Sequence, residues 1–227
     1  MKNLVKLFTM LSALAGLCAC GGGGDGATAT PVGTPVNLTA FKGVLMGTAA
    51  GSHYSFPGLA GTDSQGRAWT GSFSLVADGP TTFETQNVTV CRALTTLQLG
   101  TGTPVSAVGT RYFLVADGSI YKNVDSYGLV SVPVSQAAVP DIPKVGDSGT
   151  IATFNNSDGT TLTATWALNA DVNGASRLVI TSVTRSGATL VDSETDTYYL
   201  DAAGNPVRFA VIVTASGVTI NLSGNRV

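Results

Sequence analysis

The feature that most constrains the fold is a repeated alternation of apolar and hydroxyl-bearing residues along short segments. In residues 162–168 (LTATWAL) the leucines and the tryptophan fall in one phase, and the threonines fall in the other. Residues 69–75 (WTGSFSL) and 218–222 (VTINL) repeat this pattern. A period of two places one set of side chains on a dry face of a β-strand and the other set on a wet face. These segments therefore predict strands, and no segment shows a convincing helical period.

Turn signals that contain glycine separate the alternating segments. They are Asp78-Gly79, Asp117-Gly118, Asp158-Gly159, Gly187, Gly204 and Gly217. Asp-Gly pairs tolerate the positive φ of tight hairpin turns, so these signals predict antiparallel hairpins. We therefore expect an all-β fold over residues 38–227, either an antiparallel sandwich or a closed or half-open barrel of about ten to twelve strands.

This domain contains an internal repeat. Residues 64–75 (SQGRAWTGSFSL) align with residues 157–168 (SDGTTLTATWAL) at a shift of 93 positions. The repeat predicts two similar halves, at about 41–132 and 145–227, that share one core. The proline-rich stretch 133–144 between them suits a connection rather than a central strand. Two separate small domains, or chance similarity between Thr-rich strands, are the alternatives.

The N-terminus has the pattern of an export signal. Residues 1–6 carry two lysines, and residues 7–17 carry no charge and are too few to span a bilayer. Residues 17–20 (LCAC) then resemble the lipobox of bacterial lipoproteins. The resemblance implies that residues 1–19 are a signal peptide and that Cys20 becomes the lipidated N-terminus.

Lipidation of Cys20 would fix where the protein resides. A thiolate is a suitable nucleophile for a diacylglyceryl group, and several acyl chains anchor a protein firmly to a membrane. Gly21 follows Cys20 where an aspartate would retain a lipoprotein on the inner membrane, so the resemblance implies the outer membrane. Residues 20–37, rich in Gly, Ala, Thr and Pro, then predict a flexible tether. A disulfide or metal role for Cys18 and Cys20 is the alternative.

The charge balance argues against a nucleic-acid partner. Loss of Lys2 and Lys6 with the signal peptide would reduce the 12 basic residues to 10 against 14 acidic ones, a net charge near −4. Such a chain has no positive patch for nucleic acid or anionic lipid headgroups. No motif predicts a cofactor. Cys91 would be the one remaining thiol, and we expect it to pack as a small apolar residue.

One stretch resembles the nucleophile motif of chymotrypsin-like proteases. Residues 146–150 read GDSGT, and His53, the one histidine of the chain, precedes Ser148 as in that family. A serine nucleophile needs a base such as histidine. The residues around His53 do not match the family, and its usual disulfides are absent, so we expect no catalytic pair and no enzyme.

An acidic stretch is the one candidate for a metal site. In residues 192–196 (DSETD), the acidic residues Asp192, Glu194 and Asp196 alternate with hydroxyl residues. Their carboxylates therefore share one face of a strand and form a candidate Ca²⁺ site. We favour a different interpretation, in which these residues form the solvent-facing side of an exposed edge strand. Their mutual repulsion would then prevent this edge from pairing with another chain. No Cys/His spacing predicts zinc.

The aromatic residues suggest a core and, alternatively, a ligand groove. Most of them, including Tyr198 and Phe209, are expected in the core, whereas Trp69 and Trp166 are weak candidates for lining an apolar groove. Residues 195–225 (TDTYYLDAAGNPVRFAVIVTASGVTINLSGN) resemble the closing hairpin of the lipoprotein-carrier fold, an open half-barrel that shields acyl chains. Two functions therefore stay open. The first is a non-catalytic envelope lipoprotein with a structural or partner-binding role, and the alternative is a carrier of a lipid or other apolar ligand.

Overall fold

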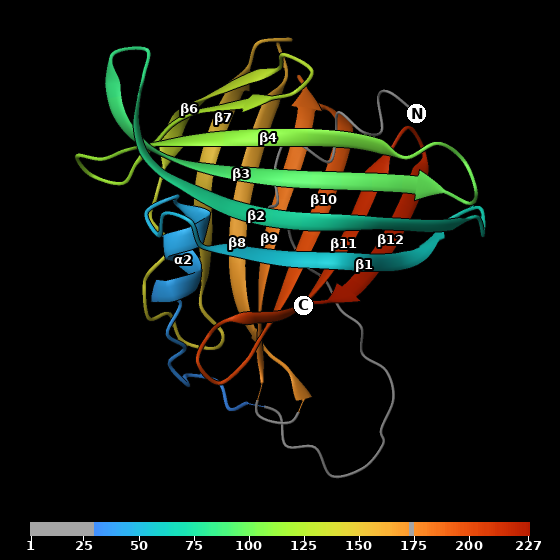
Figure 1. Ribbon diagram of the computed structural model, residues 1–227, viewed down its shortest axis with the longest axis horizontal. Coiled ribbons are helices and arrows are strands. Elements are labelled where there is room, and N and C mark those ends of the chain that lie inside the picture. The colour runs from blue at the N-terminus through green and yellow to red at the C-terminus, as the bar shows by residue number, and fades with distance from the viewer. Residues whose placement is uncertain (1–29, 173–174) are drawn as a thin grey trace.

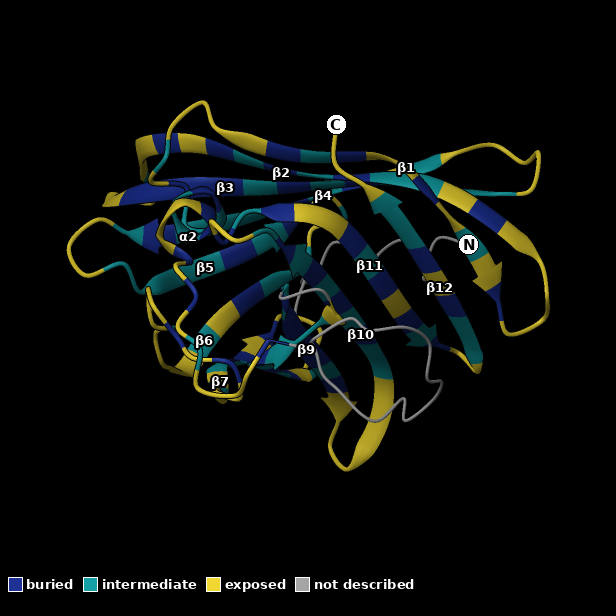
Figure 2. Cartoon of the chain, turned by 90° about the horizontal axis from the view of Figure 1, so that it is seen from below, coloured by how far each residue is buried: buried dark blue, intermediate teal, exposed yellow. Residues whose placement is uncertain are grey.

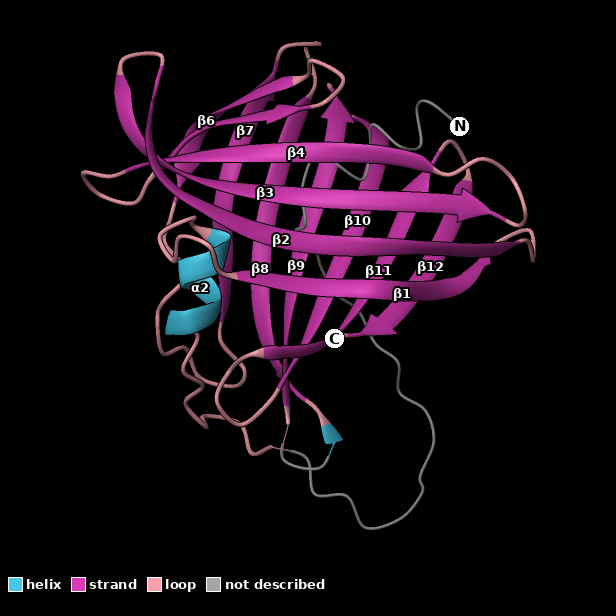
Figure 3. Ribbon diagram, viewed as in Figure 1, coloured by secondary structure: helices cyan, strands magenta, loops and turns pink. Residues whose placement is uncertain are grey.

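The computed structural model describes residues 30–172 and 175–227, and the predictions for Cys20 and the signal peptide lie outside these residues. The described part forms twelve strands and one α-helix (Figure 1, Figure 3). Their bounds are α2 (Thr39–Leu45), β1 (His53–Asp63), β2 (Ala68–Phe83), β3 (Gln86–Leu99), β4 (Val105–Leu114), β5 (Ile120–Asp125), β6 (Val130–Gln136), β7 (Ser148–Asn156), β8 (Thr161–Ala170), β9 (Ser176–Ser186), β10 (Thr189–Leu200), β11 (Pro206–Ala215) and β12 (Val218–Asn225).

The strands form one closed antiparallel barrel. Each strand pairs with its neighbours in the sequence, and β1 pairs with β12 to close the ring. The all-β prediction is confirmed at the upper end of its range of strands. Of the architectures left open, the closed barrel is the one observed, so the sheet has neither the second layer of a sandwich nor the open edge of a half-barrel.

Aspartates at the strand ends build several of the hairpin turns. Asp63, Asp125 and Asp201 each accept hydrogen bonds from the backbone N–H groups two and four residues later, at 2.8–3.0 Å. A glycine with positive φ stands three residues after each of them. The carboxylate thus stabilises the turn in place of a backbone acceptor, which is the usual role of Asp in such loops.

One predicted turn is wrong. Asp78-Gly79 lies inside β2, where the pairing with β3 shifts register between Ala77 and Gly79. Gly79 has a φ of 88°, so the positive φ indicated by the sequence is present but serves a β-bulge rather than a hairpin. The bulge lets β2 and β3 continue to the hairpin tip at Glu84 and Thr85, which projects beyond the neighbouring strands (Figure 1).

Six strands fall on each side of the connection between the two sequence repeats. Phe56 pairs with Phe73 in the first hairpin, and Gly149 pairs with Trp166 in the hairpin that opens the second half, so both pairs obey the same shift of 93 positions. The agreement does not extend along the whole of these hairpins, because β2 has 16 residues and β8 has 10. The predicted connection also begins too early, since Pro133 lies in β6, beside a register shift.

Aromatic rings fill one side of the barrel interior. Phe209 lies 4.4 Å from Phe73 and 5.4 Å from Phe56 between ring centroids, and Tyr198 lies 5.1 Å from it. Phe41 of α2 packs on Tyr198 at 4.8 Å. The expectation that these residues form the core is confirmed, and Figure 2 shows buried and exposed residues alternating along the strands.

The two ends of the barrel differ, and we call them the helix end and the turn end. α2 and the segments 115–119 and 137–147 lie at the helix end, whereas the turns 64–67 and 126–129 lie at the turn end. At the helix end α2 buries Phe41 and Val44, which are three positions apart on one face.

Residues 30–37 also pack against the helix end. Thr30 donates a hydrogen bond to the carbonyl of Ala175, and the N–H of Val36 donates to Pro143 at 2.9 Å. Thr30 and Val36 are both buried. The predicted boundary of the flexible tether at residue 37 is therefore too late, because this segment is fixed to the barrel from Thr30 onward.

Candidate ligand cavity at the helix end of the barrel

A cavity of about 360 Å³ opens at the helix end, on the side of the barrel away from the aromatic cluster. Its walls come from α2, from β4, β5, β7 and β9, and from the segments that follow β4 and β6. The apolar residues that line it are Leu38, Leu45, Met46, Phe113, Ile120, Ala137, Ala138, Val139, Ile151, Phe154, Leu178 and Ile180. This volume and this mainly apolar lining are typical of sites for small molecules.

The cavity follows from the size of the barrel. An eight-stranded barrel is just wide enough for its own side chains to fill, and the interior widens as strands are added. Here the aromatic cluster and α2 fill the interior beside β1, β2, β10 and β11. Opposite them, the inward positions of β4 and β5 hold smaller residues, among them Ala107, Gly109 and Asn123, which leave space.

The polar side chains at the mouth of the cavity are already bound to the protein. Lys42 of α2 donates to the carbonyl of Val139 and forms an ion pair with Asp141, both at 2.5 Å. The side-chain carbonyl of Gln136 accepts from the N–H of Ile120 at 2.7 Å. These contacts tie α2 and the segment after β6 to the barrel, so they shape the mouth.

Arg111 is a second positively charged residue of the lining, and it belongs to a strand rather than to the mouth. It lies at an inward position of β4, directly opposite Cys91 on β3 and Asn123 on β5. The positive charge of Arg111 acts on Glu194 and on Cys91, where it opposes the rise in pKa that burial causes. Arg111 and Asn123 both line the cavity, and Asn123 is 7 % exposed with a side-chain oxygen that accepts no hydrogen bond within the described chain. Together they form the polar inner end of an otherwise apolar site.

Carboxylates face Arg111 from the opposite wall. Glu194 and Asp196 lie on β10, six strands from β4 around the ring, and they are 5 % and 0 % exposed. Burial, followed by the charges of Asp196 and Asp192, raises the pKa of Glu194 well above its usual range, and the charge of Arg111 lowers it. Burial also raises the pKa of Asp192.

The interpretation of these acids as the wet face of an edge strand is therefore wrong. Glu194 and Asp196 are in phase with Tyr198 and Leu200, which are core residues, so all four point into the barrel. β10 is also not an edge, because β9 and β11 flank it. Within residues 30–172 and 175–227, no three acidic, cysteine or histidine side chains are grouped to hold a metal ion.

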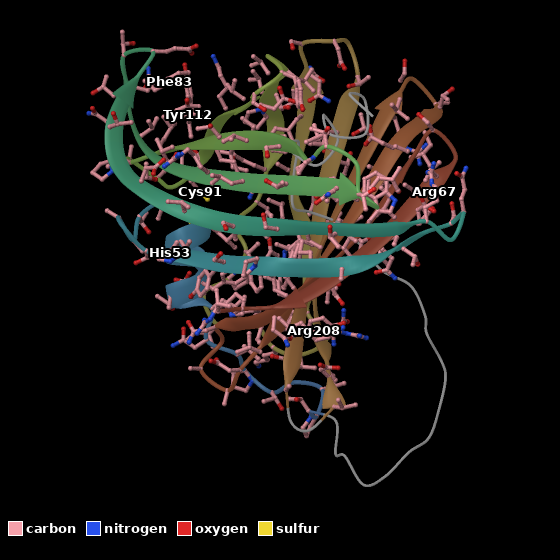
Figure 4. The ribbon with its side chains drawn as sticks, turned by 45° about the vertical axis from the view of Figure 1, so that its right-hand side comes forward. His53, Arg67, Phe83, Cys91, Tyr112 and Arg208 are labelled. Carbon is pink, nitrogen blue, oxygen red and sulfur yellow. The ribbon has the colours of Figure 1, made fainter. Side chains whose placement is uncertain are left out.

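The two tryptophans proposed for a groove point into the barrel but do not line the cavity. Trp69 donates its indole N–H to Asp63 at 2.9 Å, and Arg67 donates to the same carboxylate at 2.6 Å. This group lies at the turn end, where Figure 4 shows Arg67 far from His53. Trp166 is 6 % exposed beside Gly149 in the core.

The chain does not bring together the residues of the protease-like motif. His53 begins β1 and Ser148 begins β7, on opposite walls of the barrel, and both are exposed. Cys91, expected in the core, is fully buried, and burial raises the pKa of its thiol to about 11. A buried thiol that stays protonated at neutral pH is a packing residue rather than a nucleophile.

Sequence reasoning missed Arg111, Asn123 and the role of α2. A signal for Arg111 was present, because it occupies the same phase as Ala107, Gly109 and Phe113 along β4. A charged residue in the inward phase of a strand is costly unless it has a function or a partner. No pattern in the sequence shows which inward positions border the cavity, since that depends on how the barrel closes.

Comparison with known proteins adds no assignment. No family model matches the chain, and neither a curated protein nor a solved structure matches it. In the described ranges, no helix combines the length and the apolar character needed to cross a membrane.

Proposed function

We propose that this protein is a lipid-anchored envelope lipoprotein whose barrel binds a small apolar or amphipathic molecule. The observation that carries the proposal is the 360 Å³ cavity, lined mainly by aliphatic and aromatic side chains, at the helix end of the barrel. Burial of apolar ligand surface in such a cavity is favourable by about 25 cal/mol per Å². The proposed role is binding rather than catalysis, and the mainly apolar lining supports it.

The first described residue lies at the same end of the barrel as the cavity. Lipidation of Cys20 would hold the protein to the outer membrane, as the lipobox resemblance implies. Thr30, the first described residue, is fixed at the helix end. Ten peptide units separate Cys20 from Thr30, so an extended chain would span at most about 35 Å. The tether would therefore keep the cavity mouth close to the bilayer, which is a source of apolar molecules.

A second candidate is a structural or partner-binding role. The tip of the β2–β3 hairpin favours it, because Phe83 stacks on Tyr112 with ring centroids 3.9 Å apart outside the barrel (Figure 4). Glu84 follows at a φ of 47° and binds both Tyr121 and Lys122. This rigid projection is suited to contact with another protein.

The test of ligand binding uses residues 27–227, because the described residues carry the complete barrel and its core. The protein is titrated with N-phenyl-1-naphthylamine, a neutral dye whose fluorescence rises in apolar surroundings. Ile151→Trp places a larger side chain at the cavity wall. Ile212→Trp is the matched control, since Ile212 is 40 % exposed on the outer face of β11.

We expect saturable dye binding to the unaltered protein and to Ile212→Trp, with a loss of at least tenfold in affinity for Ile151→Trp. Circular dichroism melts establish that both variants are folded. Equal binding by the two variants would show that the dye binds elsewhere. No saturable binding to the unaltered protein would contradict the ligand-binding role and favour the partner-binding role.

A further inference from the structure

The chemistry of the inner end of the cavity indicates what kind of ligand it takes. The walls are apolar on the α2, β7 and β9 sides, and the polar atoms at the inner end belong to Arg111 and Asn123. A pure hydrocarbon would leave the donors of Arg111 without a partner. Since a ligand that covers a polar group without a hydrogen bond binds less well, the site favours a ligand that supplies an acceptor there.

The geometry favours an anionic group as that acceptor. A guanidinium carries five N–H donors in a planar fork and has no acceptor, and it binds carboxylates with two parallel hydrogen bonds. Lys42, the other cation that lines the cavity, is already paired with Asp141. Arg111 thus provides the positive charge at the inner end of the cavity.

The groups that face Arg111 must also be considered. Glu194, Asp196 and Asp192 project from β10 across the barrel, and Cys91 and Asn123 flank Arg111 on the neighbouring strands. A fully ionised set of carboxylates would repel an anion. Burial and the charges of Asp196 and Asp192 raise the pKa of Glu194, so Glu194 repels an anion less than a carboxylate with an ordinary pKa would.

We propose that the cavity binds an amphipathic monocarboxylate, with its carboxylate on the guanidinium of Arg111 and its apolar chain directed toward α2. This inference rests on the proposed ligand-binding function and specifies its substrate class. The ligand would enter through the mouth with its charged group first, and its apolar end would remain beside Leu45, Met46 and Val139 at the helix end.

The experiment compares three ten-carbon probes, decanoate, decanol and decylamine, by isothermal titration calorimetry on residues 27–227 below their micellar concentrations. The variant Arg111→Met replaces the charge by an apolar chain of similar length. Arg111→Lys keeps the charge but removes the planar fork. Arg208→Met is the matched control, because Arg208 lies on the outer face of β11 over the ring of Tyr199.

The expected result is that decanoate binds at least tenfold more tightly than decanol, and that decylamine binds more weakly than either. Arg111→Met should remove the preference for decanoate while decanol binding stays within about twofold, and Arg208→Met should change neither. Arg111→Lys should retain part of the preference for decanoate, because a positive charge at this position still attracts the carboxylate.

The following results would overturn the inference and leave the ligand-binding function standing. They are equal binding of decanol and decanoate, and a preference for decanoate that survives in Arg111→Met. Preferred binding of decylamine would also overturn it and would assign the polar end to the carboxylates of β10. Failure of all three probes and of N-phenyl-1-naphthylamine to bind would instead overturn the ligand-binding function itself.

Discussion

Closure of the barrel depends on a glycine at the β1–β12 seam, and Gly61→Ala tests this dependence. Gly61 pairs with Leu222 on β12 and with Trp69 on β2. A Cβ atom added to Gly61 would lie 1.8 Å from the carbonyl oxygen of Asn221 and 2.9 Å from its carbonyl carbon. Both atoms belong to the backbone of the closing strand, so the clash cannot be relieved by a side-chain rotation. β1 and β12 must separate instead.

The cost follows from the overpacking and from the ladder hydrogen bonds that weaken. Overpacking costs about 1–3 kcal/mol, and each lost backbone hydrogen bond costs about 0.5–1.5 kcal/mol. With one such bond lost, we expect a destabilisation of about 2–4 kcal/mol. In a domain of this size 1 kcal/mol lowers Tm by about 2–4 °C, so the melting temperature should fall by roughly 4–16 °C.

Gly58→Ala is the matched control on the same strand. A Cβ at Gly58 would have no heavy atom within 4 Å, so its Tm should change by no more than about 2 °C. The assay is thermal unfolding followed by circular dichroism, with hydrogen exchange of the β1 and β12 amides to locate the change. If both variants melt at the same temperature, or if exchange accelerates equally on all strands, the assignment of β1–β12 as a tightly packed seam is refuted.

Three further predictions concern the interior. Phe209→Ala removes the ring shared by three aromatic contacts and should lower the free energy of unfolding in urea by about 3–5 kcal/mol. The control Ile212→Ala, on the outer face of β11, should lower it by under about 1 kcal/mol. Equal losses in the two variants would contradict the assigned core. Because the folded-state pKa of Glu194 is raised, its contribution to stability is complete below the ordinary carboxyl pKa and is lost as pH rises through the folded value. Glu194→Gln should therefore become more stable relative to the unaltered protein between pH 4 and 8, and parallel unfolding curves would refute this. The buried thiol of Cys91, with a pKa of about 11, should react with iodoacetamide after unfolding in urea and hardly at all before it; rapid labelling of the folded protein would show that the barrel opens there.

The alternation of residues was sufficient to predict the class of fold, because the period of two and the Asp-Gly turns act locally. The same alternation could have corrected the interpretation of the acidic stretch. Glu194 and Asp196 share a phase with Tyr198 and Leu200, and the apolar members of a phase indicate which face is buried. The residues that follow the acidic stretch in the same strand, and not the charges alone, indicate which way these side chains point.

The cavity could not be predicted in the same way. It depends on closure of twelve strands and on α2, whose seven residues carry too short an apolar pattern to indicate a helix. It also depends on contacts between distant segments, such as Lys42 with Asp141. Barrel closure brings β4 opposite β10, so the relation between Arg111 and Glu194 is a consequence of the ring and not of the local sequence.

Native mass spectrometry of residues 27–227, exported without the anchor and purified gently from the periplasm, tests the central claim most directly. The account predicts a monomer that carries an additional small mass, which disappears in Ile151→Trp and persists in Ile212→Trp. It further predicts that the released molecule is an amphipathic acid. A bare monomer mass, together with no uptake of added decanoate or N-phenyl-1-naphthylamine, would contradict a ligand-binding barrel and direct attention to the projecting β2–β3 hairpin as a site of protein contact.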